Sequence, residues 1–233
     1  MSVVNLPIAE PEVAGFYTVG EVARILRIES EAKVRRWVVA QGGNAPVIQR
    51  QYATEYLDQE LGFYDLMEIR FVEYFRRQNV SLQSIRKAAA AARRELHTRH
   101  PFALSNVKFV TDRKRIFLHT AQEEHDNRLM DIVSGQHAMY DVIENFLAKG
   151  VEFVPSTGLV RLWKPKPKEF PKVVLDPRFA HGQPTIEGKG VPTSALFHLW
   201  RAEEQDINPV ADWFELDRSD VQQAIEYELE LAA

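Results

Sequence analysis

Apolar residues recur at helical spacing near the start of the chain. Two short amphipathic stretches flank a polar break at residues 27–30. Thr18 followed three residues later by Glu21 forms a capping box, which predicts that the first helix begins there. Ser30 is placed to cap the second helix, and the glycine pair at 42–43 is expected to end it. The inward positions of the two helices are expected to be Val19, Val22, Ala23, Ile25, Leu26, Val34, Trp37 and Val38.

Two longer helices are predicted next. Residues 64–78 and 81–96 each keep a helical period of apolar positions. Asn79 is suited to the left-handed conformation that ends a helix, Ser81 can cap the second of the two, and Pro101 stops it. Their inward positions are expected to be Leu66, Ile69, Phe71, Val72, Phe75, Ile85, Ala89, Ala92 and Leu96.

The hydrophobic period changes after residue 100. The stretch "NVKFVTDRKRIFLH" predicts a β-hairpin around residues 112–114, and "VEFVPSTGLVRLW" predicts a second hairpin around residues 155–158. A helix carrying Val142, Ile143, Phe146 and Leu147 is predicted between them. Three prolines and no apolar period in "KPKPKEFPK" predict a stiff, extended linker over residues 164–172, crossed by few contacts. We therefore expect a domain boundary there.

The last part of the chain predicts a strand, a turn-rich loop and three short helices. Thr193 is expected to cap the first helix, and Asn208 the second, with Pro209 at its first position. Asp217, with Asp220 three residues on, is expected to cap the third. The fold class expected is mainly α, within the α+β class. The expected divisions are a domain of residues 1–163, a linker of residues 164–172 and a three-helix domain of residues 173–233.

Composition excludes several classes of protein. A chain of 233 residues with 45% hydrophobic content is long enough to bury a core. It contains no cysteine, which excludes disulfides and thiolate zinc sites. Its first residues do not have the pattern of a signal peptide, and no apolar run approaches the roughly 20 residues that span a bilayer. We expect a cytoplasmic protein with no membrane partner.

The net charge of −4 is unevenly distributed along the chain. Residues 17–100 hold 14 Lys and Arg against 10 Asp and Glu, residues 101–172 hold 11 against 9, and residues 173–233 hold 4 against 12. Phosphate attracts the basic first part and repels the acidic last part, which indicates two different partners. A basic helix behind a tight turn is typical of proteins that read the DNA major groove. The same charges could equally be the solvated face of an ordinary amphipathic helix.

A family resemblance favours a DNA-binding role for this basic helix. The stretch "YTVGEVARILRIESEAKVRRWV", a short extended segment with Arg50, and "FYDLMEIRFVEYFRRQNVSLQSIRKAA" together resemble the winged helix-turn-helix of the MerR family over about residues 16–96. The resemblance implies that Lys33, Arg35 and Arg36 face DNA and that Arg50 lies on the wing. The chain departs from that family in continuing into a predicted hairpin rather than a long dimerising coiled coil, and in lacking metal-sensing cysteines.

A second resemblance covers residues 173–228, which begin "VVLDPRFAHGQPTIEGKGVPT". This region is similar to the domain-of-unknown-function 433 family, with a Gly-x-Pro turn, a Gly-x-Gly turn and a three-helix unit of helix-turn-helix type. Proteins that combine a MerR-like N-terminal region with this C-terminal region resemble VapB-type antitoxins, which are encoded beside a PIN-domain (VapC-type) ribonuclease toxin. The resemblance implies an antitoxin that binds and inhibits this toxin, binds operator DNA to repress its own operon, and forms homodimers within a larger toxin–antitoxin hetero-oligomer.

The toxin contacts are sought in and after the linker. A PIN-type nuclease gathers carboxylates around a metal ion, so an inhibitor can present a cation to them, whereas acidic helices suit a basic, RNA-gripping surface. The candidate toxin contacts are Lys166, Lys168, Arg178, Glu203, Glu204 and Asp212. DNA contact by the last helix, through Arg218 and Gln222, is less favoured. Binding there would bring neighbouring acidic side chains close to DNA phosphates, which repel them.

The sequence predicts no enzyme, metal site or cofactor. His119, Glu123 and His125 resemble metal ligands but have no matching set of ligands elsewhere in the sequence. His181 and His198 have no acid or nucleophile in a recognisable catalytic arrangement. The turn "EGKGVPT" lacks the glycine spacing of a phosphate loop. One alternative stays open, namely an effector-responsive transcription regulator without a protein target. An apolar pocket between the predicted hairpins and the helix at residues 142–147 would favour it.

Overall fold

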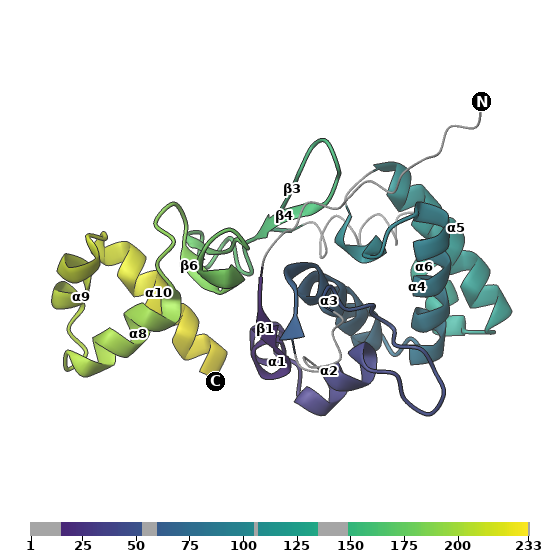
Figure 1. Cartoon of the computed structure of the whole chain (residues 1–233), viewed down its shortest axis with the longest axis horizontal. Helices are drawn as coiled ribbons and strands as arrows, with labels where there is room; N and C mark the ends of the chain where they lie inside the picture. Colours follow the sequence, from purple (N-terminus) through teal and green to yellow (C-terminus); the bar gives the residue numbers. More distant parts are fainter. Residues whose placement is uncertain (1–14, 53–59, 105–106, 135–148, 233) are drawn as a thin grey trace.

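The computed structural model of the chain describes residues 15–52, 60–104, 107–134 and 149–232, and helices dominate these ranges (Figure 1). The fold is α+β, as predicted. In chain order the elements are β1 (Tyr17–Thr18), α1 (Val19–Leu26), α2 (Glu31–Val38), β2 (Glu60–Leu61), α3 (Phe63–Arg77), α4 (Leu82–Leu96), η1 (Pro101–Ala103), α5 (Val107–Glu123), α6 (Asn127–Ser134), β3 (Val151–Phe153), β4 (Val160–Trp163), β5 (Val173–Leu175), η3 (Ala180–Gly182), β6 (Pro184–Ile186), α8 (Thr193–Ala202), α9 (Ile207–Phe214) and α10 (Arg218–Ala232).

Helices α1 and α2 begin where the sequence predicts, but α2 ends earlier than predicted. The Thr18 hydroxyl accepts the Glu21 N–H at 3.1 Å and the Glu21 carboxylate accepts the Thr18 N–H at 2.7 Å, which confirms the capping box. Helix α2 begins after Ser30, although the Ser30 side chain makes no capping hydrogen bond. It ends at Val38, before the glycine pair at 42–43, which instead forms a turn closed by a bridge between its two flanking residues.

Helices α3 and α4 complete the core of the first part of the chain. Asn79 has a φ of 63° and the Ser81 hydroxyl accepts the Ser84 N–H at 3.0 Å, so both predicted signals are confirmed. Helix α3 is buried on nearly every face because the other helices surround it. Phe71 on α3 stacks on Phe102 with ring centroids 4.0 Å apart, and similar contacts reach α5. A single hydrophobic core therefore joins helices α1 to α6.

The predicted hairpin around residues 112–114 is wrong, because residues 107–123 form helix α5. The sequence around 112–114 contains no glycine or asparagine, the residues that a tight hairpin turn favours. In the second half of α5, Ile116, Phe117, Thr120 and Ala121 are buried at helical spacing. The hairpin around residues 155–158 is confirmed, since β3 and β4 pair antiparallel. The helix predicted over residues 142–147 lies outside the described residues.

The segment 164–172 is not the isolated, extended linker that its prolines predict. Strands β3, β4, β5 and β6 form one antiparallel sheet in that order, and Trp163 pairs with Leu175 across the segment. Phe170 is buried, and Lys164 donates its backbone N–H to Gly150 at 2.7 Å. The proline spacing does predict the lack of helix, but sheet pairing on both sides draws the segment into the fold.

The C-terminal helices pack around a core of their own. This core contains Ile186, Leu196, Val210, Ala211, Leu216, Val221, Ala224 and Ile225. Two of the three predicted caps are displaced, whereas Asp217 directly precedes α10 as predicted. Thr193 is the first residue of α8 and its hydroxyl donates to Glu228 at 2.5 Å, while Asp206 caps α9 by accepting the Asn208 N–H at 2.9 Å. Helix α10 begins directly after Asp217 and has 15 residues, so it is longer than predicted.

Contacts join strand β1 and helix α1 to the C-terminal part of the chain, contrary to the prediction that few would cross. Figure 1 shows these two elements next to the C-terminal end of α10. The Tyr17 hydroxyl donates to the Gly182 carbonyl at 2.6 Å, and the Phe16 N–H donates to the His181 carbonyl at 2.9 Å. Further along α1, Arg24 pairs with Glu228 at 3.1 Å. Helix α1 and strand β1 therefore form the face on which the C-terminal part docks. Among the described helices, none has the length and apolarity to span a membrane.

Candidate DNA-binding and protein-binding surfaces

The outward face of α2 carries two exposed arginines. Arg35 lies 3.6 Å from Glu31 in an exposed pair of the kind that contributes little, and Arg36 makes no ion pair within the described ranges. Lys33 is different, because its ammonium lies 3.2 Å from the buried Glu73 carboxylate on α3. The structure thus leaves Arg35 and Arg36 available to a ligand and ties Lys33 to the core.

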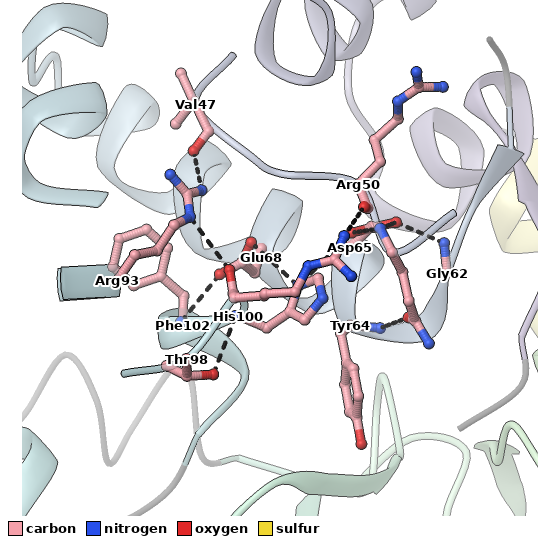
Figure 2. Close-up of polar contacts among 12 residues, drawn as sticks. Val47, Arg50, Gly62, Tyr64, Asp65, Glu68, Arg93, Thr98, His100 and Phe102 are labelled. Carbon is pink, nitrogen blue, oxygen red and sulfur yellow. Dashed lines mark hydrogen bonds and ion pairs between the residues drawn. The ribbon is translucent and has the colours of Figure 1, made fainter. Parts of the chain in front are cut away.

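Arginines hold the segment at residues 45–51 that carries Arg50. This segment follows α2 and contains bends but no strand, so the extended wing expected there is not formed by residues 45–52. Arg86 donates to the Ala45 carbonyl at 2.8 Å, and Arg99 donates to the Arg50 carbonyl at 3.0 Å. Arg93 donates to the Val47 carbonyl (Figure 2). The backbone of the segment is therefore fastened to α4 and to the turn after it.

These arginines form a basic groove that sequence reasoning missed. The groove has a volume of about 810 Å³ and lies between the segment 45–49, α4 and α5. Arg86, Arg93 and Arg99 donate to carbonyl oxygens, which are neutral, so these bonds do not cancel their charge. Arg94 lines the same groove. The pair "RR" at 93–94 was the available signal, but a charged pair near the end of a helix is most often plain surface.

Asp65 anchors both ends of the segment between residues 51 and 62. Its carboxylate accepts the Gln51 N–H at 2.9 Å and the Gly62 N–H at 2.8 Å, and the Gln51 side-chain oxygen accepts the Tyr64 N–H at 3.3 Å (Figure 2). A Cβ at Gly62 would lie 2.0 Å from that oxygen, so the close approach requires glycine. Burial raises the pKa of Asp65 to about 6, while the nearby His100 and the two backbone N–H donors act to lower it.

His100 lies beneath this anchor with a second buried carboxylate. Its Nδ1 is 3.8 Å from the Asp65 carboxylate and 3.7 Å from that of Glu68, and all three side chains are fully buried (Figure 2). Glu68 accepts the Phe102 N–H at 3.2 Å. The cluster supports the segment above it and does not face solvent. Within the described ranges no group of three or more His, Asp or Glu side chains is arranged to hold a metal ion, and His119 and Glu123 form an exposed pair 3.5 Å apart.

The acidic toxin-contact candidates lie together in the C-terminal part. Glu203 and Glu204 are exposed in the turn between α8 and α9, and Asp212 is exposed on α9. Sequence reasoning missed Trp213, which follows Asp212 and leaves 78% of its surface exposed. The signal was available in "ADWFEL", where an amphipathic helix turns an aromatic residue away from its core. An exposed Trp among acids is a candidate protein-binding anchor.

The basic toxin-contact candidates lie elsewhere, and two of them have partners within the chain. Lys166 pairs with Glu230, and Arg178 forms a two-point pair with Asp176, with contacts of 2.5 Å and 2.9 Å. Lys168 is exposed and makes no ion pair in the part of the chain that the structure describes.

Comparisons with known proteins bear on both parts of the chain. Residues 173–227 match a family described as "Protein of unknown function (DUF433)", which confirms the resemblance of the C-terminal region. A protein of Mycobacterium tuberculosis named "Putative antitoxin VapB45" is 26% identical over 203 residues, which are 80% of this chain and 82% of the relative. The X-ray crystal structure of Rv2018 from Mycobacterium tuberculosis has a TM-score of 0.68 and 24% identity, and the match covers 90% of this chain and 96% of that chain. That likeness shows a shared fold.

Proposed function

We propose that this protein is the antitoxin of a type II toxin–antitoxin pair. In this role it binds and inhibits a PIN-domain (VapC-type) ribonuclease toxin and binds operator DNA to repress its own operon. The observation that carries the proposal is the similarity to a relative named as an antitoxin, which extends over four-fifths of both chains. The DUF433 match of the C-terminal region supports it.

DNA binding is assigned to the first part of the chain. The side chains that support it are Arg35 and Arg36 on the open face of α2 and the arginines of the basic groove. Guanidinium groups bind phosphates through paired N–H donors, and releasing counterions from DNA drives such binding. A homodimer is proposed because operators with two half-sites match proteins with two-fold symmetry.

Toxin binding is assigned to the C-terminal part, whose 12 acidic residues exceed its 4 basic ones. Trp213 supplies an apolar anchor, and Glu203, Glu204 and Asp212 supply charges that suit the basic surface of a ribonuclease. Inhibition is proposed to be steric and electrostatic, with no chemistry by this chain. Lys168 is the cation best placed to approach the toxin's metal-binding carboxylates, because Lys166 and Arg178 pair internally.

The test uses the full chain and the ribonuclease encoded by the adjacent gene. We expect co-purification, loss of ribonuclease activity in the complex, and toxin affinity that weakens as salt concentration rises. Replacing Trp213 by Ala should weaken toxin binding by about 2 kcal/mol, roughly 30-fold, as for a central interface aromatic. Leu229→Ala, an exposed apolar residue on α10, is the matched control and should leave the affinity unchanged.

Equal toxin affinity of the Trp213→Ala variant and the unmodified chain would reject the α9 surface. A ribonuclease that remains active with saturating amounts of this protein would reject the antitoxin proposal itself.

A further inference from the structure

A pocket of about 310 Å³ lies where the C-terminal part meets the first part of the chain. One wall comes from the end of α1 and from α3, and the other comes from α10 and the residues around 163–166. This pocket is separate from the α2 face, the basic groove and the α9 surface. Small-molecule sites have volumes of about 300–1,000 Å³ and are frequent at such junctions.

The pocket lining combines apolar surface with an excess of positive charge. Five cations line it, namely Arg27, Arg70, Arg77, Lys149 and Lys166, against one acid, Glu73. Glu230 and Glu73 pair with three of the five cations. Lys149 is exposed and has no ion pair in the described ranges. The apolar surface comes from α1, α10 and Pro165.

Two buried polar groups of the lining residues have no hydrogen-bond partner within the described chain. They are the indole N–H of Trp163 and the hydroxyl of Tyr227, in side chains that are 5% and 2% exposed. Leaving such donors unsatisfied is costly, and native structures contain few of them. Arg70 lies over the Trp163 ring at 4.8 Å from its centroid, and burial lowers the pKa of this arginine to about 10, so it stays charged at neutral pH.

We propose that this pocket binds a small oxyanion attached to an apolar body, such as an aromatic carboxylate or phosphate ester. The cations attract the oxyanion and the apolar wall covers the ring. The Trp163 N–H and the Tyr227 hydroxyl, whose donor atoms are closed to solvent in the structure, reach the oxyanion after a small side-chain movement. A ligand seated there contacts both parts of the chain and stabilises their docked arrangement. The inference does not depend on the proposed antitoxin function, because ligand binding is measured on the purified chain alone.

The test measures binding of benzoate and phenyl phosphate to the full chain by calorimetry, with benzamide as the neutral comparison. We expect saturable binding and a raised Tm with at least one anion, and none with benzamide. Tyr227→Phe removes the hydroxyl donor and keeps the ring, whereas Trp163→Phe removes the N–H together with the five-membered ring of the indole. Each should weaken anion binding by about tenfold or more, as for a hydrogen bond to a charged group.

Trp213→Phe and Tyr74→Phe make the same chemical changes outside the pocket and should bind the anions as the unmodified chain does. Lys149→Glu reverses an exposed charge at the rim, and it should abolish anion binding while leaving the fold intact. The proposal is overturned if neither anion saturates a site, if benzamide binds as tightly, or if the pocket and control variants lose affinity alike. If either buried variant fails to fold, unchanged anion binding by Lys149→Glu overturns it.

Discussion

Asp65 is a single buried carboxylate that binds the backbone at two positions, Gln51 and Gly62. Its two oxygens accept backbone N–H groups from both ends of residues 51–62. This geometry requires an ionised or strongly accepting group in a position with no exposure to water. The free-energy cost of that burial appears as the raised pKa of Asp65.

The first prediction concerns the pH dependence of folding stability. The folded-state pKa of Asp65 is about 6, against an ordinary value of 3.8. Because the folded state binds this proton more tightly, the stability it contributes is greatest below pH 4 and is lost as pH rises to about 6. An Asp65→Asn variant cannot titrate there. From pH 4 to pH 7 the unmodified chain should therefore lose about 2 kcal/mol of unfolding free energy relative to the variant.

The measurement is urea unfolding at a series of pH values for both chains. Other carboxylates, such as Glu230 beside Lys166, have lowered pKa values and act in the opposite sense, so only the difference between the chains isolates Asp65. A difference that stays constant from pH 4 to pH 7 would show that this carboxyl titrates normally.

At the scale of elements, helix α2 illustrates how the fold divides the basic residues of one helix. Arg35 and Arg36 face outward, whereas Lys33 turns to the Glu73 carboxylate. A helix places residues three apart near one another, so sequence spacing groups Lys33 with Arg36. Only the position of α3 determines that Lys33 has a partner.

The second prediction is that Arg35 and Arg36 contact DNA phosphates and Lys33 does not. Replacing both arginines by Ala should weaken operator binding and reduce the slope of log affinity against log salt by about 0.9 for each phosphate group that is no longer bound. Gel shifts at several salt concentrations measure this slope. Lys33→Ala is the internal control, since it should lower stability through loss of the Glu73 pair and leave the slope unchanged. Unaltered operator binding by the double variant would remove α2 from the DNA surface.

At the scale of the whole molecule, the docking of the C-terminal part includes a close approach between the Tyr17 side chain and the backbone of Gly182. Gly182 has a φ of 84°, and a Cβ there would lie 2.3 Å from the Tyr17 hydroxyl oxygen. That hydroxyl donates to the Gly182 carbonyl, and burial raises the pKa of Tyr17, so it remains protonated. The hydrogen bond thus joins residues that are 165 positions apart in sequence.

The third prediction is that Gly182→Ala weakens this docking. Gly188 has a φ of 74° and no atom within 4 Å of the position that an added methyl group would occupy, so Gly188→Ala carries the same backbone strain without the clash. Strain in the left-handed region costs about 1–2 kcal/mol in both variants. Gly182→Ala should lose about 1–3 kcal/mol more, through the Tyr17 hydrogen bond. Thermal unfolding and limited proteolysis of the two variants test this, and equal stability would show that the hydrogen bond is dispensable.

The sequence by itself determined the features that depend on neighbouring residues. Thr18 with Glu21, Ser81 and Asn79 mark helix ends through hydrogen bonds and dihedral preferences that operate within a few positions. The inward faces of α1, α2 and α4 follow from periodicity for the same reason. The C-terminal family resemblance likewise depends on short turn motifs, and the match over residues 173–227 confirms it.

Only the tertiary structure decided the features that depend on distant residues. Residues 107–123 form a helix whose buried positions in its second half, Phe117 and Ala121, lie four residues apart, and Phe117 packs on Phe71 and Phe75 of α3. The proline-rich segment is held within the fold because β4 and β5 pair on either side of it. The basic groove and the junction pocket gather side chains from elements far apart in sequence. Local patterns carry no information about such partners, since burial and pairing energies are realised only when the chain has folded.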